Sequence, residues 1–117
     1  MGNPLCHFEF LTNDPDKCKA FYSKVFDWEY QGAPGSDEYT LINTGSEPGG
    51  GMMKRPDPCP MPMVGVYFLV DDIDETLAKV TEAGGNVVMP KMEIPNIGWI
   101  AVFVDPENIG IGIFQGK

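Results

Sequence analysis

The residues best suited to chemistry lie near the start of the sequence, in the run His7-Phe8-Glu9-Phe10. Alternating polar and apolar residues are typical of a strand, in which successive side chains point to opposite faces. His7 and Glu9 therefore share one face of the expected strand. An imidazole, whose ordinary pKa is about 6.5, and a carboxylate can together accept and return a proton. Because His7 is the only histidine, any imidazole chemistry in this chain depends on it.

Both residues also have a plainer interpretation. His7 is either a hydrogen-bonded strand residue in a cavity wall or a group that accepts a proton or orients a ligand. Glu9 lies either at a wet rim or on an inward face, where a carboxylate must be paired, neutral or poised as a base. The residues alone leave these alternatives open.

The sequence carries a repeat that would position this strand. Asn13-Asp14-Pro15-Asp16 and Asp71-Asp72-Ile73-Asp74 begin 58 residues apart, each after a short apolar stretch and before a segment with helical spacing. Short runs of strand type follow each segment. We therefore predict an α+β fold in which two βαβββ modules form an open, curved β-cup. Residues 1–117 make one domain, with a first module at about 4–55, a proline-rich linker at 56–62 and a second module at about 63–117.

Helix signals and apolar periodicity predict the individual elements. A helix capped by Asn13 or Asp14 should end near Asp27, and a second, capped by Asp71 or Asp72, should end at Gly84-Gly85. Strands are expected at 5–11, 28–31, 38–43, 49–54, 64–70, 86–89, 98–104 and 109–115, with a crossover at 90–95. The glycines at 49–51 predict a close approach of the backbone to another group.

The predicted faces give a candidate ligand pocket. In the last two strands we expect five aliphatic side chains on the helix side: Ile100, Val102, Val104, Ile111 and Ile113. Trp99, Ala101, Phe103, Gly112 and Phe114 should then face the cavity. The predicted pocket residues are Met52, Tyr67, Trp99, Phe103 and Phe114.

Composition narrows the class of protein. A formal net charge of −9 argues against nucleic acid and anionic membranes as partners, since both would repel it. No apolar run approaches the roughly 20 residues that span a bilayer, and the first residues lack signal-peptide features. The three cysteines form no C-x-x-C pair, which favours neither a disulfide framework nor structural zinc. These observations predict a cytoplasmic protein.

The order of these motifs resembles the vicinal oxygen chelate superfamily, which includes glyoxalase I, bleomycin-resistance proteins and extradiol dioxygenases. The matching stretches cover nearly the whole chain: His7-Phe8-Glu9-Phe10, Asp14-Pro15-Asp16, Phe21-Tyr22, Val25-Phe26-Asp27-Trp28, Gly49-Gly50-Gly51-Met52-Met53, Val70-Asp71-Asp72-Ile73-Asp74, Glu82-Ala83-Gly84-Gly85 and Asp105-Pro106-Glu107-Asn108. The resemblance implies four metal-ligand positions, two in each module. His7 occupies the first, while Gly65, Gly112 and either Gly51 or Met52 occupy the others.

Only one of these four positions keeps a ligating side chain, whereas catalytic zinc sites need about three protein ligands. We therefore predict no tightly bound metal and no other cofactor. The leading hypothesis is a glyoxalase-like homodimer that binds a small molecule and either sequesters it or catalyses a lyase or isomerase step through His7 and Glu9. One alternative is a metal-dependent lyase or dioxygenase whose ligands are not recognised here. Another is a non-enzymatic, antibiotic-binding protein of the bleomycin-resistance type.

Overall fold

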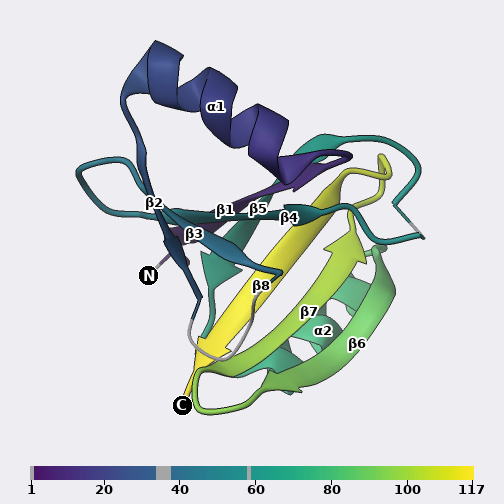
Figure 1. Cartoon of the computed structure of the whole chain (residues 1–117). Helices are drawn as coiled ribbons and strands as arrows, with labels where there is room; N and C mark the ends of the chain where they lie inside the picture. The colour runs from purple at the N-terminus through teal and green to yellow at the C-terminus, as the bar shows by residue number, and fades with distance from the viewer. Residues whose placement is uncertain (1, 34–37, 58) are drawn as a thin grey trace. The chain divides into compact units, whose positions relative to one another are not determined.

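The computed structural model describes residues 2–33, 38–57 and 59–117. Two successive sets of strand, helix and three strands follow one another along the chain (Figure 1), which confirms the α+β class and the paired βαβββ modules. The elements are β1 (Leu5–Thr12), α1 (Pro15–Phe26), β2 (Glu29–Gly32), β3 (Thr40–Asn43), β4 (Gly50–Lys54), β5 (Met63–Leu69), α2 (Ile73–Glu82), β6 (Asn86–Ile94), β7 (Gly98–Val104) and β8 (Gly110–Gly116). In the described part of the chain, neither helix is long and apolar enough to cross a membrane.

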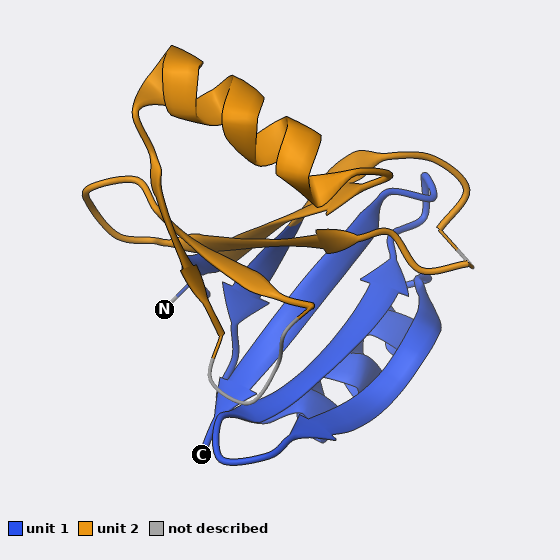
Figure 2. Ribbon diagram, viewed as in Figure 1, with its two compact units in different colours: residues 1–6, 66–117 blue, residues 7–65 orange. Residues whose placement is uncertain are grey.

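The chain divides into two compact units, shown in different colours in Figure 2. Unit 2 comprises residues 7–65, and unit 1 comprises residues 1–6 and 66–117. The first described residues thus pack with the second half of the sequence. The Leu69 amide donates to the Pro4 carbonyl at 2.8 Å, and the Asn3 side chain donates to the Leu69 carbonyl at 3.0 Å. Of the predicted linker, Pro58 lies outside the described residues.

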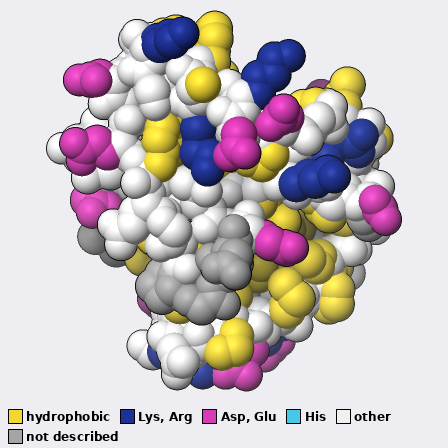
Figure 3. Space-filling view, viewed as in Figure 1, with side chains coloured by type: hydrophobic (Ala, Val, Ile, Leu, Met, Phe, Trp, Pro, Cys, Tyr) yellow, Lys and Arg dark blue, Asp and Glu magenta, His cyan; other side chains and the backbone are white. Residues whose placement is uncertain are grey.

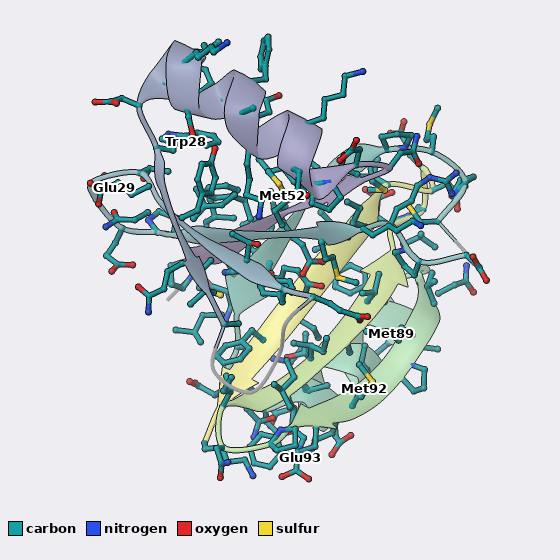
Figure 4. All side chains as sticks on the ribbon, in the orientation of Figure 1. Trp28, Glu29, Met52, Met89, Met92 and Glu93 are labelled. Atoms are coloured by element: carbon teal, nitrogen blue, oxygen red, sulfur yellow. The ribbon has the colours of Figure 1, made fainter. Side chains whose placement is uncertain are left out.

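Unit 2 is a sheet with α1 on one face, and its strand order is β2-β3-β4-β1. β1 and β4 run parallel, while β3 pairs antiparallel with both β2 and β4. Aromatic rings fill the space between helix and sheet, where Figure 4 labels Trp28 beneath α1. Ring centroids 5.0 to 6.0 Å apart link Phe8, Phe10, Tyr22, Phe26 and Trp28. These ring contacts link α1 to the sheet, although no residue of α1 is fully buried.

Local signals set the ends of α1. The Asp14 carboxylate accepts a hydrogen bond from the Lys17 amide at 3.2 Å, which satisfies one of the unpaired amides of the first turn. Pro15 follows at the first helical position, where its missing N–H costs nothing. Asp27 ends the helix in the left-handed conformation, with φ of 59°. The predicted helix from Asp14 to near Asp27 is confirmed.

Unit 1 repeats the plan with strand order β5-β8-β7-β6 and α2 on one face. β5 and β8 are parallel, and the other neighbours are antiparallel. Asp72 caps α2 by accepting from the Glu75 amide at 3.1 Å. The core under the helix consists of four buried residues and three partly buried ones: Val70, Ile73, Ala101 and Ile113, with Leu77, Trp99 and Phe103 packed against them.

Two predictions about unit 1 are wrong. Trp99, Ala101 and Phe103 face α2 rather than a cavity, because Ala101 pairs with Ile113 in the β7–β8 register. A one-residue difference in register turns every side chain of a strand to the other face. The expected crossover at 90–95 is also absent, since β6 continues to Ile94. β6 is an edge strand whose pairing is irregular around Pro90, and an edge tolerates a proline.

Candidate functional site

The central feature of unit 2 is a hydrogen-bonded chain of three side chains. The Tyr39 hydroxyl lies 2.8 Å from Nε2 of His7 and donates to Oε2 of Glu9, also at 2.8 Å. The His7 and Tyr39 rings are stacked, with an interplanar angle of 22° and centroids 6.4 Å apart. His7 and Glu9 therefore share a face of β1, as predicted, and a phenol that the prediction did not include bridges them.

Strand alternation places these groups on the sheet face away from α1. Phe8 and Phe10 point toward the helix, where Phe10 contacts Tyr22, so His7 and Glu9 point the other way. Tyr39 lies just before β3, and its carbonyl accepts from the Ala33 amide at 3.0 Å. This bond extends the β2–β3 ladder and holds the Tyr39 backbone.

The absence of a side chain at Gly51 makes room for Tyr39. Gly51 pairs with Glu9 across β1 and β4, and a Cβ at this position would overlap the Tyr39 hydroxyl and ring. A Cβ at Gly50 would likewise overlap the Phe8 ring on the opposite face. The predicted close approach at the glycine run is confirmed, and at Gly51 the approaching group is the Tyr39 side chain.

Burial favours the neutral form of the His7 imidazole. Burial lowers the pKa of His7 below its usual value, and the nearby Glu9 carboxylate raises the pKa in part. A neutral imidazole has one donor nitrogen and one acceptor nitrogen. The His7–Tyr39–Glu9 chain can therefore carry a proton between an imidazole and a carboxylate through the phenol.

The described residues do not fit the metal site that the fold implies. They include no group of three or more His, Cys, Asp or Glu side chains able to hold an ion. Of the four implied positions, Gly65 and Gly112 supply no ligand, and a Cβ at Gly112 would overlap the Tyr67 ring. His7 and Glu9 are already joined through the Tyr39 hydroxyl. Two donors on one strand fall short of the three that a catalytic zinc needs.

The structure separates the predicted pocket residues. Tyr67 and Phe114 lie on the face of unit 1 away from α2, because Gly112 and Phe114 alternate with the core residue Ile113. Trp99 and Phe103 instead pack on the α2 side, and the Nζ atoms of Lys91 and Lys117 lie 5.2 and 5.0 Å from the centroid of the Trp99 ring.

Met52 has no exposed surface, and its pairing with Phe10 places it on the α1 side of unit 2 (Figure 4). It is therefore unable to line an accessible pocket in this structure.

The face of unit 1 away from α2 is apolar, and sequence reasoning had assigned its β7 residues to the helix side. Met92 pairs with Ile100 and Met89 pairs with Val102, so all four share this face. Met92 is 48% exposed. Figure 3 shows apolar side chains gathered over the part of unit 1 formed by β6 and β7, and Figure 4 labels the two methionines there. The irregular register of β6, which puts residues three apart on one face, has no simple sequence signal.

A separate groove lies beside the start of α1, within unit 2. Its volume is about 400 Å³, and its lining residues are Thr12, Asn13, Asp14, Lys17, Cys18, Phe21, Tyr22 and Pro62. None of the three residues of the hydrogen-bonded chain contributes to it. The groove is not our candidate site, because the hydrogen-bonded side chains of His7, Tyr39 and Glu9 lie outside it.

Two compact units, each a four-stranded sheet with one helix and arranged as βαβββ, define the class of fold. The sequence profile of the Glyoxalase/Bleomycin resistance protein/Dioxygenase superfamily matches residues 5–113. The chain therefore belongs to this superfamily, which confirms the resemblance seen in the sequence.

A curated relative supports the family, and two solved structures share the fold. "Putative glyoxylase CFP32" of Mycobacterium tuberculosis is 37% identical over 102 residues, which are 86% of this chain and 39% of that protein. The chain thus spans well under half the length of this relative. Methylmalonyl-CoA epimerase from Mycobacterium tuberculosis has a TM-score of 0.70 at 14% identity, covering 97% of this chain and 88% of that one. Mn(II)-bound glyoxalase from Novosphingobium aromaticivorans has a TM-score of 0.69 at 17% identity, covering 96% and 38%. These two structures share the fold, and their names describe different reactions.

Proposed function

We propose that this protein binds a small molecule at the sheet face of unit 2 that bears His7, Tyr39 and Glu9. We further propose that it moves a proton there without a resident metal ion, in a lyase or isomerase reaction. The observation that carries the proposal is the pair of 2.8 Å hydrogen bonds through Tyr39. A carboxylate and a neutral imidazole joined by one phenol form an acid–base unit that needs no ion to couple them.

Metal analysis and a ligand panel test the proposal together. Protein purified without a histidine tag should hold no stoichiometric Zn, Ni, Mn or Fe. Stoichiometric metal would favour the metal-dependent lyase or dioxygenase instead. Thiol conjugates, aromatic diols and bleomycin-like cations are then compared by thermal shift. A ligand at a hundredfold excess over its Kd stabilises the folded state by about 2.7 kcal/mol.

Two variants separate site-specific from general effects. His7→Ala should fold normally and lose the ligand-induced shift, whereas Lys24→Ala, on the exposed last turn of α1, should retain the shift. A shift produced by cationic antibiotics alone and unchanged in His7→Ala would favour a binding protein without catalysis. No shift from any compound would contradict the proposal.

We also propose that the protein is a cytoplasmic homodimer. The observation that supports the dimer is the apolar surface of α1, where Phe21 is 58% exposed, Val25 52% and Phe26 55%. Exposed apolar groups of this kind mark interaction surfaces. Sedimentation equilibrium should give twice the chain mass, and Val25→Glu should give the monomer mass. A monomer in the unmodified protein would refute the dimer, and cell fractionation checks the location.

A further inference from the structure

We propose that Tyr39 is a positioning residue that holds His7 as the Nε2–H tautomer, makes Nδ1 the acceptor nitrogen and closes Nε2 to metal ions. This inference deepens the proposed function, because it identifies the imidazole atom that would take a proton. Its geometric part can be tested without any ligand.

The tautomer follows from counting protons along the chain. A phenol has one hydrogen to donate, and Tyr39 donates it to Oε2 of Glu9. The 2.8 Å contact between the Tyr39 oxygen and Nε2 of His7 must then use a hydrogen from the imidazole. Nε2 carries that hydrogen, and in the neutral ring Nδ1 carries the lone pair. The Nε2–H of His7 therefore donates to Oη of Tyr39, and the O–H of Tyr39 donates to the Glu9 carboxylate.

Two features of unit 2 build this arrangement. Glycine at position 51 admits the Tyr39 ring, and the β2–β3 ladder holds the Tyr39 backbone through the Ala33 amide. Tyr30 provides an internal comparison in the same unit. Its hydroxyl is buried and has no hydrogen-bond partner among the described residues. Of these two tyrosines, only Tyr39 contacts His7 in the described structure.

The same contact explains why His7 is a poor metal ligand in this chain. Zinc binds an imidazole nitrogen at about 2.0 to 2.1 Å. The Tyr39 oxygen already lies 2.8 Å from Nε2 on the hydrogen-bonding side of that nitrogen. An ion on Nε2 would therefore have to expel the phenol and remove the Nε2 hydrogen. His7 is the only one of the four implied ligand positions that keeps a ligating side chain, and its Nε2 is hydrogen-bonded to Tyr39 of the same unit.

Nitrogen-15 NMR of histidine-labelled protein tests the tautomer directly, since the chain has one histidine. At pH 8, Nε2 of the unmodified protein should give a protonated-type signal and Nδ1 an unprotonated-type signal. The reverse pattern, or an average of the two, would overturn the inference. This outcome does not depend on whether Tyr39→Phe folds.

Two variants test the part played by Tyr39. In Tyr39→Phe the Nε2 proton should move upfield and exchange faster with water, because its acceptor is gone. In the matched control Tyr30→Phe the His7 signals should stay in place. Unchanged signals in both variants, with folding confirmed by circular dichroism, would refute the role of Tyr39.

Zinc addition tests the closure of Nε2. The His7 nitrogen signals of the unmodified protein should not move with one equivalent of Zn²⁺, whatever the cysteines bind. A stoichiometric change at Nε2 would overturn the closure. Failure of the ligand panel with the expected NMR result would refute the proposed function and leave the positioning role intact. If a ligand binds as expected but the NMR signals are not as expected, Tyr39 has no positioning role and the proposed binding site stands.

Discussion

Substituting Gly51 by alanine is the sharpest test of the hydrogen-bonded chain. The added methyl group would overlap the Tyr39 hydroxyl and ring, and these are the three nearest atoms to it. The strand is fixed by pairing on both sides, to β1 and to β3. The Tyr39 side chain must therefore move away, and both of its 2.8 Å hydrogen bonds are lost.

The size of the effect follows from those two bonds. A neutral hydrogen bond contributes about 0.5–1.5 kcal/mol to the free energy of unfolding, and one to a charged group contributes about 1.5–3 kcal/mol. Their sum is about 2–4.5 kcal/mol. We expect the lower half of that range, because these residues are half-buried and water can replace part of the loss. At about 4 °C per kcal/mol for a chain of this size, Tm should fall by about 8–13 °C.

Urea unfolding followed by circular dichroism gives the free energies. Gly32→Ala is the matched control, since Gly32 lies on β2 of the same unit and an added Cβ there meets nothing within 4 Å. Its effect should stay within about 0.5 kcal/mol. A double-mutant cycle with Tyr39→Ala completes the design. Once the ring is absent, Gly51→Ala should cost under about 0.5 kcal/mol, which leaves an interaction energy of about 2 kcal/mol.

Two results would refute the reasoning. If Gly51→Ala were as stable as Gly32→Ala, the Tyr39 ring could not lie over β4 as the structure has it. If Gly51→Ala cost the same with and without the tyrosine, the loss would come from the backbone rather than from the hydrogen-bonded chain.

Three further predictions concern packing and pH. Met52→Ala should lower the free energy of unfolding by about 2–5 kcal/mol, because it empties a fully buried site, whereas Met92→Ala should cost under about 1 kcal/mol; equal losses in urea would contradict the burial. Because the pKa of His7 is lowered in the folded state, the unfolded chain binds more protons below pH 6.5. Stability should therefore fall as the pH drops below 6.5, and this slope should be smaller in His7→Gln. Glu9→Gln should lower the pKa of His7 further, since the carboxylate raises it; an NMR titration that gave a higher pKa would refute this assignment.

Much of the fold was predictable because its signals are local. Asp14 and Asp72 are strong helix caps, and each helix begins directly after its cap. The alternation in β1 places His7 and Glu9 on the face opposite to Phe8, because successive side chains of a strand point to opposite faces. The glycine run predicted a close contact, which the structure contains at Gly51.

The faces of β7 were not predictable in the same way. Both faces of this strand are apolar, since Trp99 and Phe103 alternate with Ile100 and Val102. A strand of this kind carries no polar mark that shows which side meets the helix. The pairing of Ala101 with Ile113 decides it, and that pairing is a property of the assembled sheet.

The sequence by itself determined the duplicated βαβββ plan, the capped helices and the shared face of His7 and Glu9, because each depends on residues close together in the chain. Only the tertiary structure brought in Tyr39, which is 30 residues beyond Glu9 and contacts it across β4. The space that admits its ring arises where three strands meet beside a residue without a side chain. The glycine run predicted that some group approaches the backbone there, but strand pairing over long sequence distances decides that this group is Tyr39.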